Sequence, residues 1–275
     1  MKASRISIPY EHDNQLKDFK IIRTIGTGRF GNVKLVKHKT SKEKYALKII
    51  KRECLDYPEQ VYDEVKVFEK LTHVNIVSYK DFFKDEKNYY ILMEYIEGLD
   101  LFEFIKVNKN MDETIICYIF TQILDGVSYM HKKDIIHRDI KLENILIDKK
   151  MTVKICDFGW SKCTKYRCNE MCGTNEYMAP EMTKKKWYDS KVDIWALGIL
   201  LHELFHAESP HPVVKNQKEL LENISDGKVY INKKGLSESA LDLLVQLLRY
   251  NADKRPTIEE VICHEWIIDN NDFIL

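Results

Sequence analysis

The sequence IHRDIKLEN at residues 136–144, followed by ICDFG at residues 155–159, carries the strongest signal in the chain. Asp139 and Asn144 lie in a stretch that we predict to be a loop, and Asp157 follows the short β-like run VKIC. Phosphoryl transfer requires a carboxylate near the attacking hydroxyl and oxygen ligands for Mg²⁺. These polar residues stand among isoleucines and leucines, which argues against a chance set of surface residues. The pattern therefore predicts a magnesium-dependent phosphoryl-transfer site.

A glycine-rich motif, GTGRFGNV at residues 26–33, lies between two predicted strands. Glycines let a backbone approach phosphates closely because they lack a Cβ atom. In dinucleotide-binding folds the same glycine spacing stands between a strand and a helix, so its setting here argues against such a site. Taken alone, the motif is equally consistent with an ordinary hairpin turn. The glycines expected to hold phosphate are Gly26, Gly28 and Gly31.

Lys48 lies in an apolar predicted strand, with Ala and Leu before it and two isoleucines after it. An ammonium group in such a setting needs a nearby anion to offset its lost hydration. Glu64, on the helix predicted to follow, is the candidate partner. The alternative is a lysine whose ammonium group reaches solvent and a glutamate on the exposed face of the helix.

The composition shows no dominant charge. The chain has 275 residues, 44% of them hydrophobic and 31% charged, and its 43 basic and 43 acidic residues cancel. No overall field steers it toward nucleic acid or anionic lipid, so we expect neither nucleic acid nor a membrane as partner. The longest apolar run, residues 194–201, is shorter than the roughly 18 residues of a membrane span, and the N-terminus lacks the apolar core of a signal peptide.

Seven cysteines are an odd number for a disulfide framework. Three of them cluster, but their spacing matches no zinc pattern and no histidine stands among them: Cys163, Cys168 and Cys172. We therefore expect free thiols and a cytosolic or nuclear setting.

Periodicity divides the chain into a strand-rich part and a helix-rich part. Short β-branched and aromatic runs predict strands at residues 19–26, 32–38, 44–50 and 89–95. One helix interrupts them, with apolar residues at helical spacing at Val61, Val65, Phe68 and Leu71. Later helical patterns lie at residues 115–130, 190–208 and 237–248. We expect a hinge near residues 94–98, with a nucleotide in the crevice between two lobes.

Together these motifs resemble those of the eukaryotic protein kinases over residues 19–268. Further motifs agree: APE at 179–181, DIWALG at 193–198 and KRP at 254–256. In the family the equivalents of Glu181 and Arg255 form a buried ion pair, and that of Asp193 anchors the catalytic loop.

The resemblance implies an α+β, bilobal protein kinase fold. It would have a five-stranded antiparallel sheet and one regulatory helix in the N-lobe, and a mostly helical C-lobe. The implied division is an N-terminal extension at 1–18, the N-lobe at 19–95, the C-lobe at 96–268 and a tail at 269–275.

The resemblance also implies a role for each site residue. Lys48, positioned by Glu64, would hold the α- and β-phosphates of ATP. Asp139 would orient the substrate hydroxyl and accept its proton, and Asn144 and Asp157 would bind Mg²⁺. The cofactors implied are therefore ATP and Mg²⁺.

Lys141 is the residue typical of serine/threonine kinases at its position. It would neutralise charge on the transferring phosphate, with support from Thr174. The adenine pocket implied by the resemblance has Met93 as its gatekeeper, and consists of Ile25, Val33, Ala46, Met93, Glu94, Ile96 and Leu146.

Within the kinases, the sequence DFGWS at residues 157–161 is characteristic of the Aurora family, since most kinases have Leu or Phe in place of Trp160. Three other stretches agree, namely FGNV at 30–33, MCGT at 171–174 and CHEWI at 263–267. The chain resembles an Aurora-like mitotic kinase, and its short flanks suggest a minimal form. The alternatives are a serine/threonine kinase of another group (polo-like or calcium-dependent) and a pseudokinase scaffold, against which the complete catalytic set argues.

The Aurora resemblance implies protein substrates and an activating or targeting protein docked on the N-lobe. It also implies a location in the nucleus and cytoplasm, at the spindle or centromere.

Glu170 stands where Aurora kinases usually carry a phosphorylatable threonine, two residues before Cys172. A carboxylate has less charge and fewer oxygens than phosphate, but it can still pair with Arg138 and with Arg167. We therefore expect basal activity that does not depend on phosphorylation at this position. The alternative is a glutamate that merely lies on a solvated loop.

An acidic rim is expected to select Arg or Lys before the target residue, as Aurora-like kinases do. Glu143 is the main candidate, and its helpers would be Glu97, Asp100, Glu103 and Glu176. Taken singly, most of the helpers are equally well explained as solubilising surface residues. Cys156, where Aurora kinases have alanine, is expected to line the back of the ATP cleft as a small apolar residue.

Overall fold

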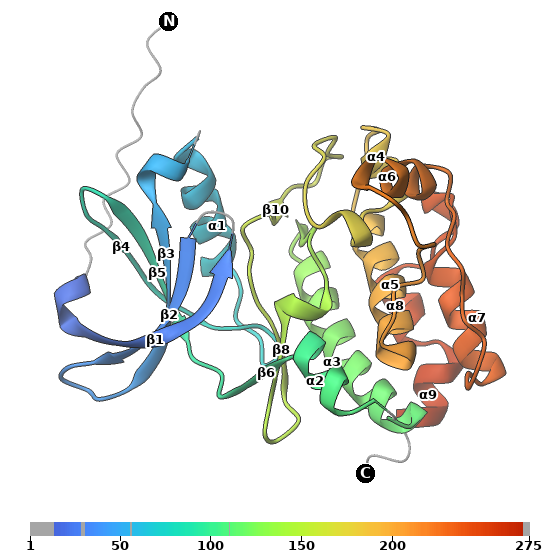
Figure 1. Ribbon diagram of the computed structural model, residues 1–275, viewed down its shortest axis with the longest axis horizontal. Helices are drawn as coiled ribbons and strands as arrows, with labels where there is room; N and C mark the ends of the chain where they lie inside the picture. Colours follow the sequence, from blue (N-terminus) through green and yellow to red (C-terminus); the bar gives the residue numbers. More distant parts are fainter. Residues whose placement is uncertain (1–13, 29–30, 56, 110, 272–275) are drawn as a thin grey trace, which may run out of the picture. The chain divides into compact units, whose positions relative to one another are not determined.

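The computed structural model describes residues 14–28, 31–55, 57–109 and 111–271. The chain divides into two compact units (Figure 1). The first contains the described residues up to Glu69 together with Ser78–Ile96, and the second contains Lys70–Val77 and the described residues from Glu97 onward. Phe30, one of the Aurora-like marks, lies outside the described residues, as do residues 1–13 of the expected extension and 272–275 of the expected tail.

The first unit is built on a five-stranded antiparallel sheet with the order β1-β2-β3-β5-β4, which confirms the predicted N-lobe sheet. Its strands are β1 (Phe19–Gly28), β2 (Gly31–His38), β3 (Lys44–Lys51), β4 (Tyr79–Lys84) and β5 (Asn88–Glu94). Helix α1 (Glu59–Glu69) accompanies the sheet, and short 3-10 helices lie at Leu16–Asp18 and Arg52–Cys54. The predicted Leu71 is buried but lies beyond the end of α1.

The sheet separates an apolar cluster on one face from several candidate site residues on the other. The cluster consists of Phe19, Val36, Leu47, Phe83, Tyr90 and Leu92. Successive strand residues point to opposite faces and cross-strand partners to the same face. Lys48 is adjacent to Leu47 and pairs with Val33, so the two share the face opposite the cluster. Ala46 and Met93, which also pair with each other, share that face.

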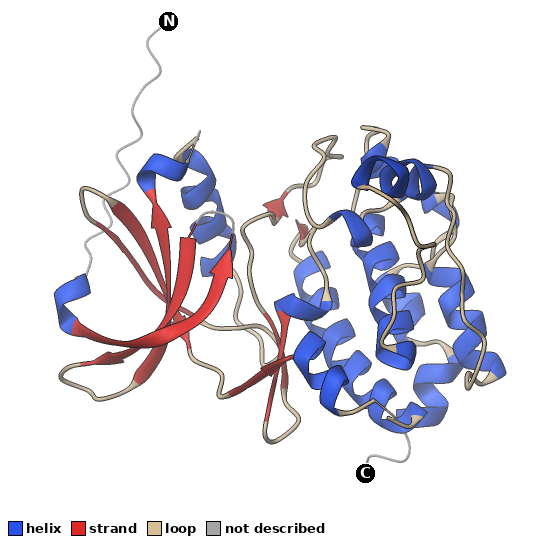
Figure 2. Ribbon diagram, in the orientation of Figure 1, coloured by secondary structure: helices blue, strands red, loops and turns tan. Residues whose placement is uncertain are grey.

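The second unit is mostly helical, as Figure 2 shows in blue. Its α-helices are α2 (Leu101–Val107), α3 (Glu113–His131), α4 (Pro180–Thr183), α5 (Lys191–His206), α6 (Gln217–Ser225), α7 (Glu238–Leu247), α8 (Ile258–Ile262) and α9 (Glu265–Asn271). Short 3-10 helices lie at Leu142–Asn144, Asn175–Tyr177 and Ala252–Lys254. A three-stranded sheet has the order β6-β8-β9, from β6 (Gly98–Asp100), β8 (Ile145–Asp148) and β9 (Val153–Ile155). A two-stranded sheet joins β10 (Lys162–Cys163) to β7 (Ile135–Ile136).

Helix α5 is buried around its circumference, as expected for a helix that is apolar on every side. Its buried residues include the charged Asp193 near its start, whose partners belong to the site. Helix α3 begins at the cap residue Asp112, whose carboxylate accepts a 2.9 Å hydrogen bond from the Ile115 amide. These two helices form the support on which the catalytic segments rest. Among the described residues, no helix combines the length and apolarity needed to cross a bilayer.

The segment 70–77, which the sequence places in the N-lobe, packs with the second unit instead. Asn75 explains this assignment, because its side-chain amide donates to the Val153 carbonyl at 2.9 Å and its carbonyl accepts from Ile155 at 2.8 Å. The Val77 amide donates to the Ile155 carbonyl at 2.9 Å. The segment thus extends the edge of strand β9.

Candidate active site

The glycine-rich motif forms the hairpin between β1 and β2 in the first unit, with Gly28 opposite Gly31 in the register. A Cβ atom at Gly31 would lie 1.7 Å from the carbonyl oxygen of Ile49, so the sheet itself requires glycine there. A Cβ atom at Gly28 would meet nothing closer than 3.8 Å. Glycine at that position is therefore not needed for packing, which is consistent with the predicted close approach of a phosphate. Residues 29–30 of the motif lie outside the described residues.

Lys48 of β3 and Glu64 of α1 form the predicted ion pair, with 2.6 Å between Nζ and Oε1. Their side chains are only 18% and 7% exposed, so each charge depends on the other for compensation. The strand and the helix together fix the position of the ammonium group.

The other predicted adenine-pocket residues lie in both units. Ile25 is half-buried in β1, and Glu94 ends β5 with its carboxylate accepting a 2.6 Å hydrogen bond from the Ser78 amide. The Glu94 amide in turn donates to the Ser78 carbonyl at 3.0 Å, so Glu94 and Ser78 are joined by two hydrogen bonds. Ile96 follows β5 and is half-buried, and Leu146 is half-buried in β8 of the second unit.

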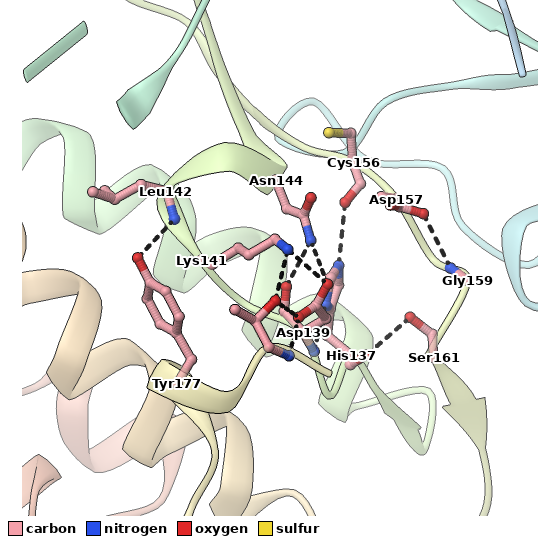
Figure 3. A network of polar contacts seen from close by, with 11 residues as sticks. His137, Asp139, Lys141, Leu142, Asn144, Cys156, Asp157, Gly159, Ser161 and Tyr177 are labelled. Atoms are coloured by element: carbon pink, nitrogen blue, oxygen red, sulfur yellow. Dashed lines mark hydrogen bonds and ion pairs between the residues drawn. The ribbon is translucent and has the colours of Figure 1, made fainter. Parts of the chain in front are cut away.

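Asp139 is the centre of a hydrogen-bonded group in the second unit (Figure 3). Its Oδ1 accepts from the amide and from the hydroxyl of Thr174, both at 2.8 Å. Its Oδ2 accepts from Asn144 Nδ2 at 3.0 Å and lies 3.3 Å from Lys141 Nζ. Lys141 also donates to the Thr174 hydroxyl at 2.7 Å. The structure thus brings together the predicted base, the predicted phosphate-neutralising lysine and a predicted metal ligand.

The predicted metal ligands supply the hard oxygen donors that Mg²⁺ prefers. Asn144 donates through Nδ2 to the main-chain oxygen of Asp139 at 2.8 Å as well as to its carboxylate, which orients the amide oxygen away from Asp139 (Figure 3). The carbonyl of Asn144 accepts from the Cys156 amide at 2.9 Å, so the segment that carries Asp157 is tied to the catalytic loop. Asp157 is exposed and has a left-handed backbone with φ 61°. An amide oxygen and a carboxylate on joined segments fit a site for one magnesium ion.

Asp193 at the start of α5 fixes the backbone of the catalytic loop. Its carboxylate accepts from the main-chain amides of His137 and Arg138, both at 2.9 Å, and contacts His131 Nε2 at 2.8 Å. Burial opposes the charge on Asp193, but the hydrogen bond and charge of His131 outweigh that effect and lower its pKa. The predicted anchoring contact is therefore present, with His131 as a partner that the sequence did not reveal.

The activation segment, residues 157–181, crosses the catalytic loop closely at Gly173. A Cβ atom there would lie 2.3 Å from the carbonyl oxygen of Arg138, and the backbone has φ 89°. Only glycine accepts both conditions without strain. This close crossing places Thr174 against Asp139.

Glu170 forms an ion pair with its predicted partner Arg138, with 2.7 Å between Oε2 of Glu170 and Nη1 of Arg138. Its second oxygen, Oε1, is 2.6 Å from Nζ of Lys162, a partner that the sequence analysis missed. Arg167, the other predicted partner, lies instead 4.0 Å from Asp189. Partial burial opposes ionisation of Glu170, but the hydrogen bonds from Lys162 and Arg138 outweigh it and lower the pKa. Glu170 is therefore a charged residue with two cationic partners.

A half-buried carboxylate, Glu203 of α5, adds to the predicted acidic rim. It accepts a hydrogen bond from the Tyr177 hydroxyl. Burial, reinforced by the charges of Glu143 and Glu176 and opposed by the Tyr177 bond, raises the pKa of Glu203 to about 7. The charges of Glu143 and Glu176 thus both act on the carboxylate of Glu203.

Two of the predicted rim helpers have other uses. Asp100 caps helix α2 by accepting from the Glu103 amide at 2.8 Å, and Glu103 itself pairs with Lys106 at 2.7 Å. Glu97 is exposed. The rim in the second unit is therefore better described by Glu143, Glu176 and Glu203.

Comparison with known proteins agrees with this geometry. The protein kinase domain family matches residues 19–267. An Aurora kinase of Eremothecium gossypii is 36% identical over 99% of this chain and 75% of its own length. An Aurora kinase of Candida glabrata is 38% identical over 96% of this chain and 75% of its own length. The serine/threonine-protein kinase DCLK3 of Mus musculus is 35% identical over 91% of this chain, but over only 33% of its own length. The chain therefore belongs to the protein kinase family and is a serine/threonine kinase of the Aurora type.

Proposed function

We propose that this kinase transfers the γ-phosphoryl group of ATP, bound with Mg²⁺, to serine or threonine hydroxyls that follow basic residues in protein substrates. The observation that carries the proposal is the hydrogen-bonded group of Asp139, Lys141, Asn144 and Thr174. The test is transfer of labelled γ-phosphoryl from MgATP to serine peptides by the purified protein, with the labelled residue located by mass spectrometry. Failure to label any serine or threonine would contradict the proposal.

The residues of the second unit account for the proton and the charge in this reaction. A substrate hydroxyl beside Asp139 donates to the carboxylate and loses its proton there as its oxygen attacks the γ-phosphorus, and the bond from that phosphorus to the β,γ-bridging oxygen breaks to release ADP. Lys141 supplies positive charge to the oxygens of the group in transfer, and its bond to Thr174 holds it in place. Asn144 and Asp157 would hold Mg²⁺, which neutralises charge on the β- and γ-phosphates when bound. In the first unit, the paired Lys48 would bind the α- and β-phosphates.

Basic substrate recognition is supported by the acidic rim of Glu143, Glu176 and Glu203. In the free protein Glu203 loses its proton only near pH 7. A bound guanidinium favours the ionised carboxyl, so binding of an arginine peptide releases a proton below that pH. Affinity must therefore rise with pH as the carboxyl ionises.

We predict that the Kd of an arginine peptide falls about tenfold between pH 6 and pH 8. The measurement is peptide fluorescence anisotropy with a non-hydrolysable nucleotide present. The Glu203→Gln variant, which can still accept from Tyr177, should show a flat profile, as should a peptide with alanine in place of arginine. An unchanged pH profile in Glu203→Gln would exclude Glu203 as the group responsible.

We also propose that activity does not require phosphorylation at position 170. Glu170→Ala should lower kcat about fivefold and change the KM for ATP by less than twofold, because a half-exposed ion pair contributes about 1 kcal/mol. The wild-type Glu170 side chain is 51% exposed. Steady-state kinetics of the unphosphorylated protein measure this effect, with Asn169→Ala as the matched control on the same segment. An unphosphorylated wild-type protein that is inert until Thr164 or Tyr166 is modified would refute the idea.

The cellular role is proposed from the Aurora relatives alone. We propose a role in chromosome segregation or the spindle, a location in the nucleus and cytoplasm, and an activating or targeting protein on the N-lobe. Co-purification from dividing and from resting cells tests this. Partners enriched in dividing cells and lost with substitutions on the N-lobe surface would support it, and an identical set from both cell states would contradict it.

A further inference from the structure

Tyr188 lies between the activation segment and helix α5 and contacts both ends of the Glu170 ion pair. Its hydroxyl donates to the main-chain carbonyl of Glu170 at 2.7 Å and accepts from Arg138 Nη1 at 3.1 Å. Its backbone pairs with Cys168, amide to carbonyl in both directions, at 2.8 and 2.7 Å. One residue thus holds the activation segment by main chain and by side chain.

Arg138 is the common partner of these contacts. Its Nε donates to the Trp160 carbonyl at 2.6 Å, and its Nη1 donates to Glu170 as well as to Tyr188. Its own backbone is held by Asp193. Arg138, which immediately precedes the base Asp139, therefore binds the activation segment at two points, Trp160 and Glu170.

Burial distinguishes the two side chains that meet Arg138. The Glu170 side chain is 51% exposed, whereas Tyr188 is 3% exposed. Water and salt weaken an exposed ion pair, but they do not screen a buried hydrogen bond. Removing the tyrosine hydroxyl would leave the Glu170 carbonyl and one Arg138 donor without their buried partner, which costs more than loss of an exposed contact.

We infer that Tyr188 is a positioning residue, which holds the activation segment on Arg138 and so keeps Thr174 and Asp139 in their reactive arrangement. Glu170 adds charge to this contact, but the buried hydroxyl carries the larger share of it. The inference rests on the proposed function, because the arrangement that Tyr188 maintains is the one assigned to phosphoryl transfer. It explains how the segment is held without a phosphate.

The test compares Tyr188→Phe with the control Tyr90→Phe. Tyr90 is also buried, at 1% exposure, and its hydroxyl donates to Asp85 at 2.7 Å; it belongs to the apolar cluster on the sheet face opposite Lys48. Tyr188→Phe should lower kcat about tenfold and leave the KM for ATP within about twofold, because the ordered segment becomes less populated. Tyr90→Phe should leave both constants unchanged, whatever its effect on thermal stability.

Hydrogen exchange supplies a readout that does not depend on activity. Amides of residues 164–172 should exchange about tenfold faster in Tyr188→Phe than in wild type and at the wild-type rate in Tyr90→Phe. A combined Tyr188→Phe and Glu170→Gln variant should lose less activity than the product of the single effects, since both contacts share Arg138. A kcat within twofold of wild type, or unchanged exchange, would overturn the inference. If the wild type phosphorylates no peptide, the proposed function fails, and the exchange rates alone decide the role of Tyr188.

Discussion

Asp139→Asn is expected to lower kcat on a serine peptide by about 10³-fold, because the amide cannot accept the proton of the substrate hydroxyl. The substitution preserves size, and the amide oxygen can still accept from Thr174. Affinity for MgADP should therefore stay within about threefold of wild type, since Asp139 is not among the predicted nucleotide ligands. Steady-state kinetics and nucleotide titration measure the two quantities separately.

Asp134→Asn is the matched control for this experiment. Asp134 lies in the same chain segment, its side chain is 47% exposed, and its φ of 58° is one that asparagine accepts readily. The kcat of the Asp134→Asn variant should equal that of wild type. A loss smaller than tenfold in Asp139→Asn, or an equal loss in Asp134→Asn, would remove Asp139 from its assigned role.

The catalytic residues could be predicted because they break the local pattern. Lys48 is a charge inside an apolar strand, and Asp139 and Asn144 are polar residues among isoleucines and leucines. Burying such groups without partners is unfavourable, so their presence signals partners elsewhere in the chain. The structure supplies those partners as Glu64 for Lys48 and Thr174 for Asp139.

Some parts of the fold lacked a readable local pattern. Strand β4 carries adjacent buried residues, Phe82 and Phe83, and an irregular register between Tyr79 and Asp81, so it shows no alternation. The position of residues 70–77 depends on the hydrogen bonds of Asn75 to β9, which join residues far apart in sequence. Neither feature has a short-range sequence signal.

The supporting residues of the site were missed for the same reason. Tyr188 is a single tyrosine before a helix, and Glu203 is a single glutamate in a largely apolar helix, so neither has a motif. Their roles follow from Arg138 and Tyr177, which lie distant in sequence. Asp100 was different, because an aspartate three residues before Glu103 at a helix start is a capping pattern that could have been recognised.

The ion pair between Glu181 and Arg255 gives the largest expected effect on stability. Arg255 is fully buried and its guanidinium meets the Glu181 carboxylate through two hydrogen bonds, at 2.7 and 2.9 Å. Glu181→Ala leaves that charge without a counterion, which should lower the free energy of unfolding by about 3–5 kcal/mol. Differential scanning calorimetry should show a melting temperature lower by on the order of 10 °C. Glu103→Ala, which removes an exposed pair of the same 2.7 Å length, should cost less than about 1 kcal/mol.

Replacing the whole pair by apolar residues should not restore stability here, although it does so in some proteins. Arg255 also donates to the main-chain carbonyls of Arg249, Lys191 and Tyr250, at 2.7, 3.0 and 3.2 Å. Glu181→Leu combined with Arg255→Met would leave these three carbonyls without their donor, and each costs about 1–3 kcal/mol if it stays buried. The double variant should therefore melt no higher than Glu181→Ala. A double variant that melts near the wild-type temperature would show that the carbonyls find other donors and that Arg255 acts through its charge alone.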